Sequence, residues 1–108
     1  MPQLVQTIET SGSSVNINIR DGGYVILNLN NDVTSIDITN WPPNLVGKVT
    51  LEVRNKGNYR ILGYGNIKWN GGIVPDNTIG ADSKDIFVLH SADAGDNVFG
   101  NIVGMNYS

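Results

Sequence analysis

The side chains that could perform chemistry in this chain begin with a single histidine, His90, which has Ser91 beside it and Ser83 nearby in the sequence. A Ser-His-Asp triad needs a serine whose hydroxyl proton the imidazole can accept. One large class of hydrolases presents that serine in a G-x-S-x-G turn, and the chain has no such motif. The chain has no cysteine either, which excludes a thiol nucleophile and a thiolate zinc site. We therefore expect His90 to be a structural residue.

Carboxylates offer a second possible chemistry, because glycoside hydrolases place a pair of them on either side of the bond they cleave. The chain has Glu9, Glu52 and eight aspartates, most of them in expected turns, where Asp commonly bonds its own backbone. The segment 93–97 gathers oxygen atoms of the kind that Ca²⁺ prefers, but a polar hairpin loop needs the same residues. We predict no enzyme, no metal and no cofactor. A carbohydrate-active depolymerase, with its carboxylate pair in a groove, is the enzymatic alternative.

Two tryptophans are candidates for binding. Trp41 stands beside two prolines, and Trp69 stands directly before Asn70-Gly71-Gly72. Aromatic side chains at loop tips can stack on sugars or anchor a protein interface. They can equally close the ends of a small β core, and the sequence leaves both interpretations open.

The charge of the chain excludes several classes of partner. The formal net charge is −3, and the seven basic residues are scattered rather than clustered, so we expect no nucleic-acid partner. No apolar run approaches the length of about 20 residues that spans a bilayer, and the N-terminus does not resemble a signal peptide. We therefore expect no membrane partner and synthesis in a cytoplasm.

The composition and the alternation of side chains predict how these residues are positioned. The chain has 11 Val, 12 Ile and 6 Thr, which favour strands, and 13 Gly and 15 Asn, which favour turns. We predict an all-β domain of eight or nine short antiparallel strands, arranged as a sandwich or a barrel. Expected strands cover Val15–Arg20 and Tyr24–Asn30 as a hairpin, a strand around Ile36 and Ile38, Val46–Arg54 turning into Tyr59–Tyr64, Ile67–Trp69, and a final pair Asp85–His90 and Val98–Gly104.

The first 14 residues differ from the remainder, so we divide the chain into an N-terminal arm, 1–14, and a single β domain, 15–108. Leu4, Val5 and Ile8 are apolar, and Ser11-Gly12-Ser13-Ser14 follows them as a flexible joint. This arm is expected either to pair with a neighbouring molecule or to form an ordinary first strand of the same domain. The candidate interface residues are Pro2, Leu4, Val5, Ile8, Trp41 and Trp69.

Several motifs resemble a β-module of tailed-bacteriophage structural proteins. The matching stretches are Ile38–Pro42 around Trp41-Pro42, Gly47–Val53, Ile67–Pro75 with its Lys-Trp-Asn-Gly-Gly, Ile86–Leu89, and Val98–Ser108 with its terminal Asn-Tyr-Ser. Where this module usually has a proline, the chain has Asn70. The resemblance covers the chain from about residue 15 onward.

The resemblance implies a role in a virion. An acidic, cysteine-free β protein of this length is similar to capsid cement (decoration) proteins, which bind the outer shell as oligomers, commonly trimers, and clamp neighbouring capsomers. The implied partners are the major capsid protein and further copies of the chain, and the implied location is the capsid surface. The alternative is a tail-fibre or receptor-binding module that recognises host surface polysaccharide.

Overall fold

The computed structural model describes residues 3–107, and these residues form eight strands and two short 3₁₀ turns. The strands are β1 (Val5–Glu9), β2 (Ser14–Asn18), β3 (Tyr24–Leu29), β4 (Ser35–Thr39), β5 (Gly47–Asn55), β6 (Ile67–Trp69), β7 (Lys84–Ser91) and β8 (Val98–Tyr107), and the turns are η1 (Ile19–Asp21) and η2 (Asn70–Gly72). The predicted all-β fold is therefore confirmed. No helix among residues 3–107 has the length and apolarity needed to cross a membrane. The candidate interface residue Pro2 lies outside the described residues.

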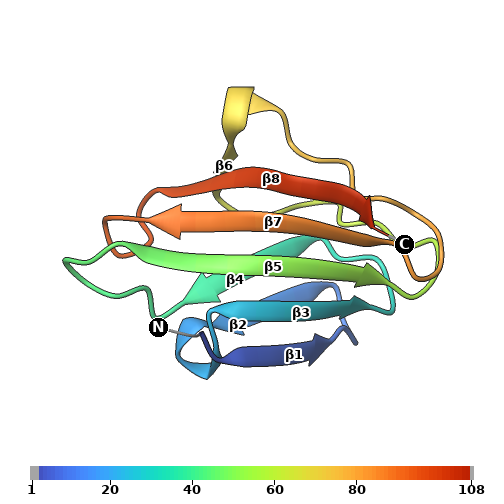
Figure 1. Cartoon of the computed structure of the whole chain (residues 1–108), viewed down its shortest axis with the longest axis horizontal. Helices are drawn as coiled ribbons and strands as arrows, with labels where there is room; N and C mark the ends of the chain where they lie inside the picture. Colours follow the sequence, from blue (N-terminus) through green and yellow to red (C-terminus); the bar gives the residue numbers. More distant parts are fainter. Residues whose placement is uncertain (1–2, 108) are drawn as a thin grey trace.

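The strands form two sheets of unequal size. The large sheet has the order β1-β3-β5-β7-β8-β6, and the small sheet consists of β2 and β4. Figure 1 shows the small sheet behind the long strands of the large one. Buried side chains of both sheets belong to one hydrophobic core. The largest fully buried apolar side chains are Phe87, Ile17, Leu27, Leu29, Ile36, Leu51 and Leu89.

The prediction that the strands run antiparallel is wrong for four of the six strand pairs. The pairs β1–β3, β3–β5, β2–β4 and β6–β8 are parallel, and only β5–β7 and β7–β8 are antiparallel. Alternating side chains show which residues of a strand face the core, but they carry no information about the direction of the neighbouring strand. The final hairpin of β7 and β8 is confirmed.

The predicted first hairpin does not form, because β2 and β3 belong to different sheets. The chain instead crosses from the small sheet to the large one through η1 and Gly22. The side-chain amide of Gln6 stabilises this crossing, since it donates to the carbonyls of Asn18 and Gly22, at 2.8 Å each. From β1 to β5 the chain thus alternates between the two sheets and winds as a short parallel coil.

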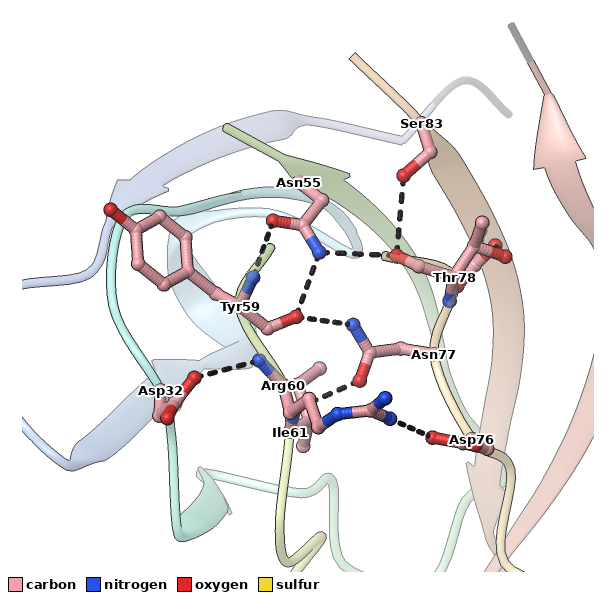
Figure 2. A network of polar contacts seen from close by, with 10 residues as sticks. Asp32, Asn55, Tyr59, Arg60, Ile61, Asp76, Asn77, Thr78 and Ser83 are labelled. Carbon is pink, nitrogen blue, oxygen red and sulfur yellow. Dashed lines mark hydrogen bonds and ion pairs between the residues drawn. The ribbon is translucent and has the colours of Figure 1, made fainter. Parts of the chain in front are cut away.

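The predicted strand Tyr59–Tyr64 is also absent, apart from one isolated parallel bridge between Ile61 and Val33. Side chains take the place of a neighbouring strand along this segment. The Tyr59 N–H donates to the Asn55 side-chain oxygen at 3.2 Å, and the Ile61 N–H donates to that of Asn77 at 2.8 Å (Figure 2). Backbone groups that are paired in this way need no sheet ladder.

Candidate functional site

The N-terminal segment lies at one edge of the large sheet, where β1 pairs with β3 (Figure 1). Of the two possibilities that the sequence left open, this pairing corresponds to an ordinary first strand. Leu4 and Val5 are 70% and 59% exposed, whereas Ile8 packs against the core. The structure therefore brings two of the candidate interface residues together on the surface and turns the third inward.

The backbone of β1 is paired on one side only. The carbonyl of Leu4 accepts from Tyr24, and the N–H of Thr10 donates to Asn28, both at 3.1 Å. Because backbone groups alternate in direction along a strand, those of the even-numbered residues face β3 and those of residues 5, 7 and 9 face away from it. Pairing within the large sheet thus leaves a row of N–H and C=O groups directed outward along the edge.

The two tryptophans lie in the core rather than at loop tips. Trp41 is 8% exposed and Trp69 is 7% exposed. Trp69 makes edge-to-face contacts with Tyr64 and Phe87, at ring-centroid distances of 5.0 and 5.4 Å. Trp41 fits beside Gly47, where a Cβ would approach its ring to 2.7 Å. This placement corresponds to the second interpretation from the sequence, that the tryptophans close the ends of the β core.

The outer face of the large sheet carries no second layer among the described residues (Figure 1). Its side chains are a mixture of apolar and polar groups, and we call this surface the outer face. Its principal members are Tyr24, Ile26, Thr50, Glu52, Arg54, Ile86, Val88, His90 and Phe99. Ile26, Ile86 and Val88 are half-buried by their neighbours, and Phe99 is exposed.

A carboxylate in the middle of the outer face is satisfied by its neighbours. Glu52 accepts a hydrogen bond from the Tyr24 hydroxyl and a charged one from Arg54 Nε, both at 2.5 Å. Burial alone would raise the pKa of Glu52, but the bonds from Tyr24 and Arg54 outweigh it and hold the pKa below its ordinary value. The Glu52 bond in turn raises the pKa of the Tyr24 hydroxyl. The outer face can therefore be covered without leaving this charge unpaired.

Shallow grooves flank the core, and two of them differ clearly in chemistry. One, of about 250 Å³, lies beside β8 and is lined by Trp69, Asn70, Ile73, Gly100, Asn101 and Ile102. The other, of about 340 Å³, lies between β4 and the loop after β7, and Trp41 forms part of its wall. The first combines an aromatic edge with two amide side chains, and the second is lined mainly by polar surface.

The histidine and the serines do not meet. His90 lies on the outer face, where its ring is 5.5 Å from that of Phe99. Ser91 is the next residue of β7 and points to the opposite side, where its hydroxyl donates to Asp93 at 2.9 Å and accepts from Gly95 at 2.9 Å. Ser83 is occupied with the Gly80 carbonyl at 2.8 Å. The hydroxyls of Ser83 and Ser91 thus bond partners other than the imidazole.

The loop at 93–97 uses its carboxylate for its own geometry. Asp93 accepts from the Asn97 side chain at 2.6 Å, from the Asn97 N–H at 2.9 Å and from Ser91, and these bonds lower the pKa of Asp93. Among residues 3–107, no group of three acidic or histidine side chains is placed to hold a metal ion. The loop is a polar hairpin connection between β7 and β8, held by these bonds.

A buried polar network, which the sequence did not reveal, lies where β5 ends and β7 begins (Figure 2). Asn55 and Asn77 are almost fully buried and bond the backbone of the loops around them. Asp85 is 2% exposed and accepts from the Thr78 N–H at 2.6 Å and from the Thr78 hydroxyl at 2.7 Å. The one signal in the sequence was an asparagine at the end of a strongly alternating strand. Each of these groups is satisfied by backbone or hydroxyl partners, so the network holds the fold together.

Comparisons with known proteins add no family to this description: no family model, no curated protein and no solved structure matches the chain.

Proposed function

We propose that this protein is a bacteriophage capsid cement protein, which binds the outer shell as an oligomer and clamps neighbouring capsomers. The proposal comes from the resemblance of its motifs to phage structural modules. Its partners are the major capsid protein and further copies of the chain, with a trimer as the oligomer that the resemblance favours. Its role is to bind rather than to catalyse.

The observation that best supports a binding role is the outer face. Half-buried Ile26, Ile86 and Val88 stand there without a covering layer, around a carboxylate that is already paired. A mixed surface of this kind resembles the composition of interfaces between separately folded proteins. Covering it removes apolar surface from water at little electrostatic cost.

The first test is the position of the protein in the virion. Electron microscopy of the particle that contains this chain is expected to find many copies spread over the shell. A few copies at the tail would instead support the tail-fibre alternative, and absence from the particle would reject both.

The second test is direct binding of the protein to emptied shells, measured by co-sedimentation. Replacing Val88, in the middle of the outer face, by Lys is expected to abolish binding while the protein stays folded. The matched control is Asn16→Lys, because Asn16 is an exposed strand residue of the small sheet, far from the outer face in the topology. Equal loss of binding in both variants would contradict a specific role of the outer face.

One observation favours the tail-fibre alternative enough to test it. The groove beside β8 places the amides of Asn70 and Asn101 next to the edge of Trp69, and amides beside an aromatic ring suit a sugar. Host surface polysaccharide is the ligand to try. Binding that is lost in Asn101→Ala, with the fold intact, would favour this alternative over the cement role.

A further inference from the structure

We propose that two copies of this chain associate by pairing their β1 strands antiparallel, so that two large sheets join into one. The proposal rests on the self-association that is part of the proposed function, and it names the contact. Because a twofold contact closes at two copies, it gives a dimer in place of the trimer that the resemblance favours. It does not depend on the shell, so its test is separate from the localisation of the protein in a virion.

The edge of β1 lacks the devices with which proteins usually protect an open strand. Natural edge strands carry lysine, proline or a bulge, or lie under a loop. Val5–Glu9 contains no lysine and no proline, and its pairing with β3 runs through all five residues without a register shift. The only charge in the strand is that of Glu9.

The direction of the backbone groups fixes how two such edges can pair. Residues 5, 7 and 9 direct their N–H and C=O groups outward, so they must form the hydrogen-bonded pairs of an antiparallel ladder. A twofold axis at Thr7 brings Thr7 opposite itself and Val5 opposite Glu9 of the other copy. This register uses all three residues of each strand and gives about six backbone hydrogen bonds. A shift of the axis to Gln6 or Ile8 would give about four.

The same register keeps the two acidic side chains apart. Glu9 of one copy lies opposite Val5 of the other, and the two Glu9 side chains stand at opposite ends of the ladder. With a rise of about 3.4 Å per residue they are about 14 Å apart, beyond the Debye length of about 8 Å at physiological ionic strength. The Glu9 carboxylate is also held within its own subunit by hydrogen bonds from Asn28 and Asn30.

The opposite edge of the large sheet is a poor partner for β1. The outermost strand there, β6, has three residues. Next to it lies the longer strand β8, whose pairing with β7 has register shifts between residues 84 and 87. Asn106, near the end of β8, has a positive φ of 59° and so departs from strand geometry. Head-to-tail growth of the sheet is therefore disfavoured. Pairing of identical edges is isologous and closes at two copies.

The experiment is sedimentation velocity over a concentration series, combined with amide hydrogen exchange measured residue by residue. We expect a monomer–dimer equilibrium in which the amides of Val5, Thr7 and Glu9 become protected as the concentration rises. The amides of Gln6 and Ile8 face β3 and are expected to be protected at every concentration. A monomer throughout the series would overturn the proposal, and so would an oligomer in which the Thr7 amide exchanges freely.

Two variants test the contact at its centre. Thr7→Pro removes an N–H that faces away from β3, and edge strands tolerate a proline at such a position. Thr7→Lys puts two ammonium groups opposite each other at the axis. Thr7→Pro is expected to raise the dimer dissociation constant at least about tenfold, through the loss of about two central hydrogen bonds. Thr7→Lys keeps the N–H and is expected to raise the constant through repulsion between the two opposed ammonium groups. Thr7→Val keeps the N–H and the shape and is expected to dimerise like the wild type. If Thr7→Pro fails to fold, Thr7→Lys decides, and unchanged dimerisation of Thr7→Lys would overturn the proposal.

Discussion

Asn55 is the residue whose replacement tests the structural account most directly. Its side chain is 1% exposed, at the end of β5. The amide nitrogen donates to the carbonyls of Tyr59 and Thr78, at 2.8 and 3.1 Å. The amide oxygen accepts from the N–H groups of Gly57 and Tyr59, at 3.1 and 3.2 Å. One side chain thus holds the turn after β5 and connects it to the loop before β7 (Figure 2).

The cost of Asn55→Ala follows from these four bonds. A hydrogen bond contributes about 1 kcal/mol net to stability, and a buried group left without a partner costs about 1–3 kcal/mol. The Tyr59 carbonyl keeps a second donor, the Asn77 amide at 3.1 Å, so its loss is smaller. We therefore expect a decrease of about 3 kcal/mol in the free energy of unfolding. For a domain of this size, that lowers Tm by about 12–24 °C.

The assay is thermal and urea denaturation followed by circular dichroism, with one two-state transition assumed for both proteins. Asn58→Ala is the matched control, because Asn58 is exposed in the same turn. Asn55→Asp keeps the oxygen that accepts from Gly57 and Tyr59 but loses both donors, so it is expected to be destabilising as well. A change below about 0.5 kcal/mol in Asn55→Ala, the size typical of a surface substitution, would show that the Asn55 side chain does not hold these loops.

Three further predictions concern packing and charge. Gly95→Ala is expected to lower the free energy of unfolding by about 2 kcal/mol or more in denaturant titrations, because φ is +90° there and a Cβ would meet the Trp41 ring. Gly12→Ala is the control and is expected to be neutral, because a Cβ at Gly12 would meet no atom within 4 Å. Phe87→Ala removes a fully buried ring and is expected to cost about 3–5 kcal/mol by the same measurement. In the folded protein the pKa of Glu52 lies below its unfolded value of 4.5. The stability that this difference contributes is present above pH 4.5 and is lost as the pH falls through the folded pKa. Glu52→Gln is expected to remove this part of the loss of stability in acid, measured by melting curves at a series of pH values.

Most strand positions were predictable from this sequence to within a few residues, because the alternation of buried and exposed side chains can be read within each strand; Tyr59–Tyr64 was the exception. Val49, Leu51 and Val53 were expected to face the core, and all three are buried. The order and direction of the strands were not predictable in the same way, since each depends on a partner far along the chain. The two successive turns of the coil in the large sheet, from Val5 to Tyr24 and from there to Thr50, are 19 and 26 residues long. Turns of such unequal length leave no repeat in the sequence.

The candidate site was predictable only in part. Leu4 and Val5 were recognised as apolar residues ahead of a polar joint, and they are exposed at a sheet edge. Trp41 was ambiguous because its burial depends on glycines at positions 47 and 95, which the sequence separates from it. The outer face could not be foreseen, because it arises where residues from four different strands come into register.

At each end of the coil the chain has backbone groups that point outward, and the two ends treat these groups differently. The difference indicates where a partner binds. Beyond β4, the N–H groups of Tyr59 and Ile61 could bond a further strand, but the side chains of Asn55 and Asn77 accept from them and end the coil. At β1, the side chains bond other parts of the subunit. Gln6 donates to the carbonyls of Asn18 and Gly22, and Glu9 accepts from Asn28 on the outer face. The chain therefore closes one end of the coil with its own amides, and at the other it keeps a strand that is able to pair. An end that can pair is where another chain adds most readily, since it gains a ladder of backbone bonds without disturbing either fold.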